Sequence, residues 1–185
     1  AHDEPHELDD LFIQRVRSDG SLPWGSTGVC ICPQSGADSW DTKIATDEVG
    51  GAFVTWEDTR TPYHFATLAQ HIDSAGNRLW TNDLLISDNT FHREIIPDGS
   101  GGAVIHCNPG SGWYNDAFRI DGGGNILWVV DSASCASQGA EMVSGEPGYF
   151  YIGHYGSLCI LGHRYDMQGN RHWPYNGVTM FSGWR

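Results

Sequence analysis

The sequence predicts an all-β protein built from repeated four-stranded antiparallel units, and three observations lead to this prediction. The chain has 185 residues and combines 24 Gly with 8 Trp, 7 Tyr and 7 Phe. Turn-forming glycines together with large aromatic residues favour sheets over helices. No stretch shows the sustained i, i+3, i+4 apolar spacing of an amphipathic helix. The third observation is an internal repeat, which sets the number and order of the units.

One half of the repeat is a strand followed by a glycine turn and a tryptophan. It occurs four times without gaps, as FIQRVRSDGSLPW (12–24), LAQHIDSAGNRLW (68–80), DAFRIDGGGNILW (116–128) and LGHRYDMQGNRHW (161–173). The glycines four residues before each tryptophan are Gly20, Gly76, Gly124 and Gly169. Glycine supplies the positive φ that a tight turn needs, and a nearby Asp can accept hydrogen bonds from the turn backbone. We therefore expect a hairpin in each copy.

The other half is strand, glycine turn, strand. It occurs as IATDEVGGAFVTW (44–56), IPDGSGGAVIHC (96–107) and MVSGEPGYFYIGH (142–154). Alternation in AFVTW and AVIHC predicts one buried and one outward face for each of these strands. One complete unit is thus two hairpins and four short strands, which is the content of one β-propeller blade.

The repeats divide the chain into a tail and about three and a half blades. The predicted parts are an acidic N-terminal tail at 1–10 and a single repeat domain at 11–185, with a half-blade at 11–32 and blades at 41–87, 93–135 and 141–182. A blade cannot bury both faces alone, so blades must stack. We expect the aligned tryptophans to pack between blades.

The half-blade lacks its first hairpin, and three explanations stay open. Residues 1–10 form a substitute strand, or the half-blade is an edge protected by charge, or a neighbouring chain completes it. The first is disfavoured because AHDEPHELDD is charged and contains proline, which makes it a poor central strand. We favour the third, and a contact of that kind, repeated head to tail, builds a ring or a filament.

The repeat resembles a known family. GGAFVTWEDTR (50–60) followed by AQHIDSAGNRLW (69–80) is similar to the tandem β-propeller repeats of large secreted bacterial and archaeal surface proteins. The similarity covers nearly all of 11–182 and is weakest in the last unit, where Gly148-Tyr149 replaces the Gly-Gly pair. The resemblance implies an extracellular or cell-surface location and no single activity.

Charge and composition exclude some partners. The formal net charge is −13 and Lys43 is the only lysine, so the basic surface that nucleic acids require is missing. No apolar run approaches the length of a membrane-spanning helix. The chain begins at Ala1 without a Met, as a mature secreted protein does.

The cysteines carry no CxxC zinc pattern. In an exported protein they predict one or two disulfides with an odd thiol and with the pairing open; buried reduced cysteines are the alternative. The candidates are Cys30, Cys32, Cys107, Cys135 and Cys159.

We expect no enzyme activity and no obligatory cofactor. Glu57 and Asp58, near Arg60, are neighbours on a strand and point to opposite faces, so they do not make a glycosidase acid–base pair. The strand histidines His106, His154 and His163 are expected to be hydrogen-bonded packing residues. A tail cluster of His2, Asp3, Glu4, His6 and Glu7 is expected to be solvated or docked through polar contacts rather than to hold a metal.

Calcium is the one cofactor worth testing, because carboxylates at glycine-rich turns can converge with carbonyl oxygens. Turn stabilisation explains the same residues without metal. The weak candidates are Asp47, Asp73, Asp98, Asp121 and Asp166.

The loop NPGSGWYNDA (108–117) predicts a second kind of site. Aromatic faces beside amides and carboxylates can stack on sugars. The candidates for glycan binding are Trp113, Tyr114, Asn115 and Asp116; a loop that packs on itself or on another subunit is the alternative reading.

These observations favour a structural, self-associating extracellular subunit of a filament, surface layer or matrix. Its partners would be other copies of itself, met through blade edges and the N-terminal tail. The alternative is a glycan-binding propeller lectin or adhesin, and a glycosidase is the third possibility.

Overall fold

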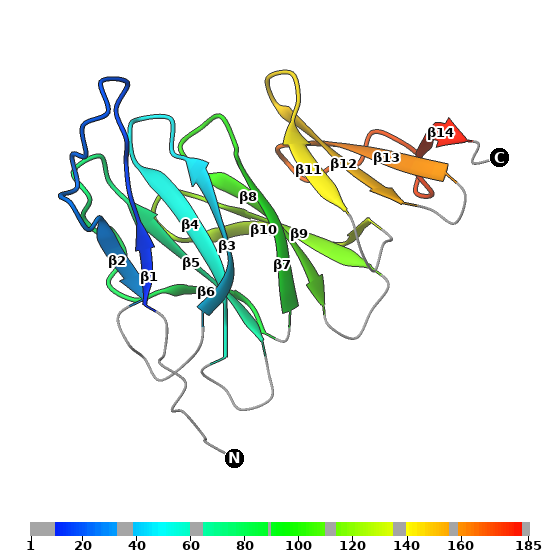
Figure 1. Cartoon of the computed structure of the whole chain (residues 1–185). Helices are drawn as coiled ribbons and strands as arrows, with labels where there is room; N and C mark the ends of the chain where they lie inside the picture. The colour runs from blue at the N-terminus through cyan, green and yellow to red at the C-terminus, as the bar shows by residue number, and fades with distance from the viewer. Residues whose placement is uncertain are drawn as a thin grey trace, which may run out of the picture.

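The computed structural model describes residues 10–32, 39–59, 65–88, 90–109, 114–134, 140–155 and 159–182. Within these ranges every regular element is a strand, and the strands form antiparallel sheets (Figure 1). The all-β prediction is therefore confirmed.

Each predicted unit is one sheet. The half-blade consists of β1 (Leu11–Ile13) and β2 (Val29–Cys32). The first blade contains β3 (Ser39–Thr46), β4 (Ala52–Asp58), β5 (Ala66–Ile72) and β6 (Leu84–Ser87). The second contains β7 (Thr90–Pro97), β8 (Ala103–Pro109), β9 (Asn115–Ile120) and β10 (Ile126–Ser134). The third contains β11 (Glu141–Ser144), β12 (Tyr149–Tyr155), β13 (Cys159–Asp166) and β14 (Val178–Ser182).

In every blade the strands pair in chain order, so each sheet is a simple meander of the β-propeller type. Figure 1 shows the sheets side by side in an open fan that runs from the half-blade to β14. The first strands of successive blades lie next to one another, since β3 contacts β7 and β7 contacts β11. The described residues form an open array of blades and not a closed ring.

The hydrophobic core lies between neighbouring sheets. Three clusters of buried side chains each draw on two adjacent units: the half-blade with the first blade, the first with the second, and the second with the third. Every residue of β4 is buried, because the half-blade packs on one of its faces and the second blade on the other. Residues 103–108 of β8 are buried in the same way, so the predicted outward face of these two strands is wrong. In β12 buried residues alternate with less buried ones, so only one face of this strand is covered.

The hairpin turns follow the chemistry expected from the sequence. Oδ1 of Asp73 accepts hydrogen bonds of 2.8 Å from the backbone N–H groups of Ala75 and Asn77. Asp121 and Asp166 make the same pair of bonds in their own turns. Gly76, at φ 91°, closes the turn in a conformation that favours glycine.

A matched pair of substitutions tests where the core ends. Ile96 and Val143 occupy the same position in successive blades, yet Ile96 is 7% exposed and Val143 is 59% exposed. We expect Ile96→Ala to lower the free energy of unfolding by about 2–5 kcal/mol, because it leaves a cavity between two blades. Val143→Ala should change it by less than about 0.5 kcal/mol under dilute conditions. Urea unfolding followed by Trp fluorescence measures both, and equal losses would contradict the open third blade.

Candidate functional site at the uncovered blade faces

Neighbouring blades contact each other in one recurrent way, in which a tryptophan packs over the turn glycine of the next unit. The three pairs are Trp24 with Gly76, Trp80 with Gly124, and Trp128 with Gly169. A Cβ at these glycines would lie 2.9, 3.0 and 3.3 Å from the respective indole. The turn glycine therefore allows the tight turn and also leaves room for the tryptophan of the preceding blade. The prediction that the aligned tryptophans pack between blades is confirmed for Trp24, Trp80 and Trp128.

Each seated indole also donates a hydrogen bond across the interface. The acceptor is the carbonyl two residues before the seated glycine. The bonds run from Nε1 of Trp24 to Ser74 O (3.2 Å), of Trp80 to Gly122 O (3.0 Å) and of Trp128 to Met167 O (2.9 Å).

The same carbonyl receives a second donor from the residue nine positions before the tryptophan. These contacts are Arg15 Nη1 to Ser74 O (3.3 Å), His71 Nδ1 to Gly122 O (3.1 Å) and Arg119 Nη1 to Met167 O (2.5 Å). We call this arrangement, two donors from one blade on one carbonyl of the next, the carbonyl clamp. Sequence alignment did not reveal the second donor, because its position holds Arg in three units and His in the other.

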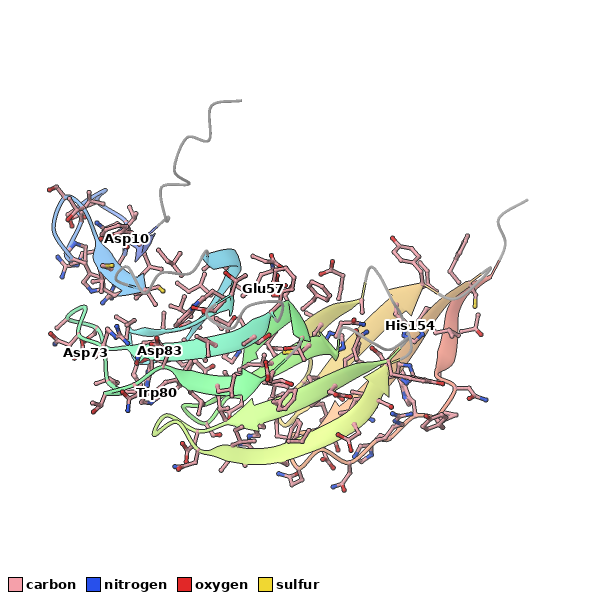
Figure 2. The ribbon with its side chains drawn as sticks, turned by 90° about the horizontal axis from the view of Figure 1, so that it is seen from below. Asp10, Glu57, Asp73, Trp80, Asp83 and His154 are labelled. Atoms are coloured by element: carbon pink, nitrogen blue, oxygen red, sulfur yellow. The ribbon has the colours of Figure 1, made fainter. Side chains whose placement is uncertain are left out.

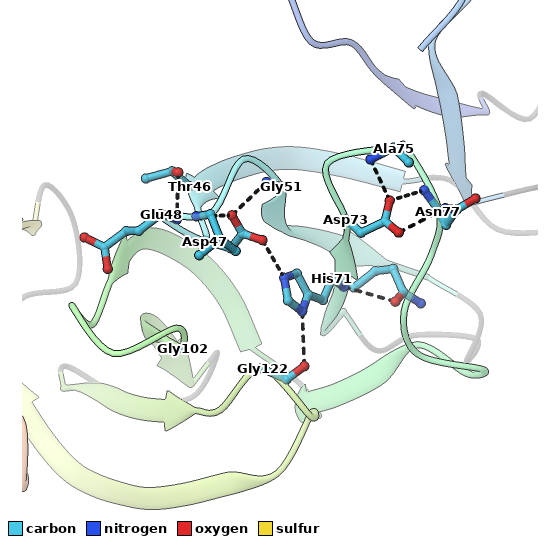
Figure 3. Close-up of polar contacts among 12 residues, drawn as sticks. Thr46, Asp47, Glu48, Gly51, His71, Asp73, Ala75, Asn77, Gly102 and Gly122 are labelled. Atoms are coloured by element: carbon cyan, nitrogen blue, oxygen red, sulfur yellow. Dashed lines mark hydrogen bonds and ion pairs between the residues drawn. The ribbon is translucent and has the colours of Figure 1, made fainter. Parts of the chain in front are cut away.

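In two blades a turn aspartate holds the second donor in place. Asp47 Oδ2 lies 3.1 Å from His71 Nε2, and Asp98 Oδ2 accepts a 2.8 Å bond from Arg119 Nε. Figure 3 shows His71 between Asp47 and the carbonyl of Gly122. Because a carbonyl oxygen only accepts, Nδ1 of His71 is the donor to Gly122 O, and Nε2 faces the carboxyl group of Asp47.

These bonds control the ionisation of the aspartates. Burial raises the pKa of Asp98, but hydrogen bonds from the backbone of Gly102 and Ser100 and from Arg119 outweigh it, so the net pKa is lowered. Asp47 behaves alike, with Val49, His71 and Gly51 as donors that lower its pKa against the effect of burial. Both groups are thus carboxylates that the turn and the clamp already use.

The third blade presents a face that no described residue covers, and we call it the tail face. A groove of about 400 Å³ crosses it, lined by Val143, Tyr151, Ile160, Trp173 and Met180 among others. Val143 is 59% and Met180 62% exposed, whereas Ala45 and Ile96, which match Val143 in the other blades, are 6% and 7% exposed. The tail face therefore exposes apolar side chains at positions that the other blades bury.

Trp173 on the tail face is set like the clamp tryptophans. Its ring lies 5.4 Å from that of Tyr151 at an interplanar angle of 52°, and Trp80 lies 6.2 Å from the matching Phe53 at 42°. Among the described residues Trp173 Nε1 has no acceptor. Arg164, at the second-donor position, pairs with Glu146 and lies 3.8 Å over the Tyr149 ring.

At the other end of the array, the half-blade presents a second face that is uncovered within the described part of the chain, and we call it the head face. Val16 on this face is 65% exposed, while Ile72, Ile120 and Tyr165 at the same position are at most 1% exposed. Phe12 beside it is 51% exposed.

The half-blade turn has the backbone of a clamp acceptor. Arg17 N donates to Ser21 O at 3.0 Å and Gly20 N donates to Arg17 O at 2.9 Å, as in the three occupied turns. A Cβ at Gly20 would have nothing within 4 Å. No described residue donates to the carbonyl of Ser18, which is the counterpart of Ser74.

Behind the tail face lie two stacked histidines. The rings of His154 and His163 are 5.1 Å apart, and both side chains are buried. Neither nitrogen of His163 has a hydrogen-bond partner in the described part of the chain. Burial, with smaller effects of His154 and Arg171, lowers the pKa of His163 to about 4. The expected hydrogen bond exists for His106, whose Nε2 lies 3.1 Å from Ser134 Oγ, but not for His163.

The structure does not gather the predicted carboxylate and metal candidates into one site. Glu57 and Asp58 are buried, and Asp58 Oδ2 accepts a 3.3 Å bond from Trp56. Figure 2 shows Asp73, Glu57 and His154 in different parts of the array. The five calcium candidates lie in five separate hairpin turns. Over the described ranges no group of three or more His, Cys, Asp or Glu could hold a metal ion.

The glycan candidates are only partly accessible. Tyr114 is 45% exposed. Asn115 is fully buried and bonded to Asn108 (2.7 Å) and Ser134 (3.0 Å), and Asp116 accepts a 2.8 Å bond from Ser132 N. Trp113 lies outside the described residues. The polar groups expected to hold a sugar are thus used within the blade.

The remaining predictions concern cysteines, tail and membrane. No disulfide joins any two of the described cysteines Cys30, Cys32, Cys107 and Cys159. Cys107 Sγ instead donates to Thr67 Oγ1 at 3.7 Å, across the interface between the first two blades. Cys135, Arg60 and tail residues 1–9 lie outside the described residues. None of the described segments forms a helix suited to crossing a membrane.

Comparison with known proteins adds little to this geometry. No protein-family model and no curated protein matches the sequence. A solved structure of a protein from Lactobacillus plantarum is similar, with 13% sequence identity and a TM-score of 0.49. The match covers 85% of this chain and 48% of the other, so the chain spans about half of that protein's length. A likeness of this strength assigns neither a family nor an activity.

The clamp predicts a difference between two identical substitutions. Trp80→Phe removes the donor to Gly122 O and should lower the free energy of unfolding by about 1–2 kcal/mol. Trp173→Phe removes a donor without a described acceptor and should change it by less than about 0.5 kcal/mol in dilute solution. Urea titration at low protein concentration compares the two; equal losses would speak against the clamp.

The buried imidazole predicts a loss of stability in mild acid. The folded pKa of His163 is lowered to about 4 from an ordinary 6.5, so the unfolded chain binds the proton first as the pH falls. Between pH 7 and pH 5 this residue should reduce the free energy of unfolding by about 2 kcal/mol. In His163→Phe, which copies Phe118 of the second blade, the decline should be smaller by that amount. Parallel urea titrations of both proteins at the two pH values measure this difference. If wild type and His163→Phe lost the same free energy of unfolding between pH 7 and pH 5, the lowered pKa of His163 would be refuted.

Proposed function

We propose that this chain is a structural, self-associating extracellular subunit, which builds a filament, surface layer or matrix from copies of itself. The observation that carries the proposal is the tail face. Val143, Tyr151 and Met180 expose apolar area at positions that the first two blades bury against a neighbour. Contiguous exposed apolar surface of this kind marks a protein interaction site.

The head face supports the same proposal from the other end of the array. Phe12 in β1 and Val16 in the segment after it are more than half exposed, while the opposite side of this sheet packs on the first blade. Two different uncovered faces on one chain give a heterologous contact, and such contacts repeat into rings or filaments.

Charge sets the conditions for association. Each copy carries a formal net charge of −13, so copies repel at low ionic strength. At physiological ionic strength salt screens the repulsion between charges that lie farther apart than the Debye length of about 8 Å, whereas it does not weaken apolar contact. Association should therefore increase with salt, which is the opposite of assembly through ion pairs.

The extracellular location rests on the resemblance of the repeats to secreted surface proteins and on the acidic composition. The described cysteines form no disulfide with one another, so they lend it no support. No metal and no catalytic group are needed for the proposed role.

Glycan binding is the second candidate, and the exposed ring of Tyr114 favours it. A lectin would retain a glycan-array signal as a monomer and lose most of it in Tyr114→Ala. A blank array at high protein concentration would remove this candidate.

Light scattering coupled to size exclusion tests self-association. We expect the mass to rise above the 20.4 kDa of one chain as protein and salt concentrations increase. Met180→Glu places a charge on the tail face and should keep the protein monomeric. Val49→Glu is the control, because Val49 is 81% exposed in a turn of the first blade, away from both end faces. A wild-type mass of one chain under all conditions would contradict the proposal.

A further inference from the structure

We propose that the tail face of one copy docks on the head face of a second copy through a fourth carbonyl clamp, with Trp173 seated on Gly20 and donating to Ser18 O. This inference rests on the proposed self-association and names the surfaces and atoms that carry it. The partner is a second copy of this chain, because the chain itself carries both the unmatched donor and the unmatched acceptor.

The donor side is complete on the tail face. Trp24, Trp80 and Trp128 all donate from Nε1 to a carbonyl of the next unit at 2.9–3.2 Å. Trp173 stands in the same position of its blade and packs on Tyr151 as Trp80 packs on Phe53. Among the described residues, Trp173 is the one tryptophan of the four whose Nε1 has no acceptor.

The second donor is also present. Arg164 occupies the position of Arg15, His71 and Arg119. Its Nη2 bonds to Glu146, and its buried Nε has no partner in the described part of the chain. The Glu146 contact takes the place of the Asp98–Arg119 pair, since Gly145 stands where the second blade has Asp98. Nη1 of Arg164 remains to reach a carbonyl, as Nη1 of Arg119 does.

The acceptor side is complete on the head face. The turn at 17–21 repeats the backbone hydrogen bonds of the three occupied turns. Gly20 has a φ of 81°, close to the 83–91° of the seated glycines. Those glycines carry an indole at 2.9–3.3 Å from the Cβ position, whereas the space over Gly20 is open. Ser18 O lies in a turn with the same backbone hydrogen bonds as the turns that hold the carbonyls of Ser74, Gly122 and Met167.

The apolar surfaces around the clamp match as well. Val16 takes the place of Ile72, Ile120 and Tyr165, each of which packs on the blade before it. On the tail face, Val143 and Tyr151 replace residues that pack on the blade after them. The two faces lie at opposite ends of the fan in Figure 1, so a second copy and not the chain's own half-blade brings them together.

Two single substitutions test the contact from its two sides. Trp173→Ala removes the donor and its ring. Gly20→Asn puts a Cβ where the indole would sit, and Asn tolerates positive φ better than other residues with a side chain. The control is Gly99→Asn, because Gly99 has a φ of 74° and equally open space but lies in a turn of the second blade. We expect each of the first two variants to weaken self-association about tenfold or more, and the control to leave it unchanged.

Mixing the two variants distinguishes a head-to-tail contact from a symmetric one. Trp173→Ala keeps an intact head face and Gly20→Asn keeps an intact tail face. The mixture should therefore form a one-to-one pair and nothing larger, seen as 1:1 stoichiometry by sedimentation velocity with one partner labelled. Formation of the pair also proves that both variants are folded. Trp173→Phe should weaken association less than Trp173→Ala, because it loses the hydrogen bond but keeps the ring.

The outcomes separate this inference from the proposed function. A wild-type protein that never associates overturns both. A wild-type protein that associates while both variants do so equally well overturns the clamp and leaves self-association standing. Loss of association in Trp173→Ala alone, without pairing in the mixture, shows a tail-to-tail contact and also overturns the clamp.

Discussion

The structure depends on apolar contact between sheets, because no sheet in it has a core of its own. Phe53 and Val104 are fully buried only through the blades that flank them. Burial of apolar area is the main favourable term in folding, so the position of a neighbour decides whether a face stabilises the fold or stays exposed. A blade without a neighbour leaves apolar area exposed that a second blade would bury. This exposed area links the fold of the chain to its proposed role.

The carbonyl clamp adds direction to this contact. Apolar packing alone tolerates sliding, whereas a carbonyl that accepts two donors holds the register between sheets. His71 shows how closely the two are joined, since one ring stacks on Phe53 at 4.2 Å and bonds to Asp47 in its own blade and Gly122 in the next. Each clamp thus fixes the position of one unit relative to the next, from the half-blade to the third blade.

The sequence predicted the units well because glycine and tryptophan have roles that depend on position. Gly76 allows a positive φ in a tight turn, and Trp80 packs on the turn of the next blade, which few other residues can do. The spacing of these two residue types therefore locates each blade boundary within a few residues. The second clamp donor was not predicted because its position holds arginine in three units and histidine in one. Both side chains can donate to a carbonyl, but in an alignment the position looks variable. Asn115 and Asp116 resembled a sugar site because their types suit one; their burial depends on Asn108, Ser132 and Ser134, which local sequence does not place. Alternation in AFVTW and AVIHC indicated two faces for β4 and β8, but only the packed structure shows that a neighbouring sheet covers both.

The turn around Gly20 and the ring of Trp173 also bear on what happens when a chain of this kind gains or loses a blade. Every unit carries one clamp donor and one clamp acceptor, so duplication or loss of a whole blade leaves the same two ends. A longer or shorter version would still be compatible with the original at both faces. In the proposed assembly, such a change would alter the angle that one copy spans, and hence the number of copies needed to close a ring. Duplication of a blade within the gene would in this way alter the geometry of the proposed assembly and leave the contact between copies unchanged.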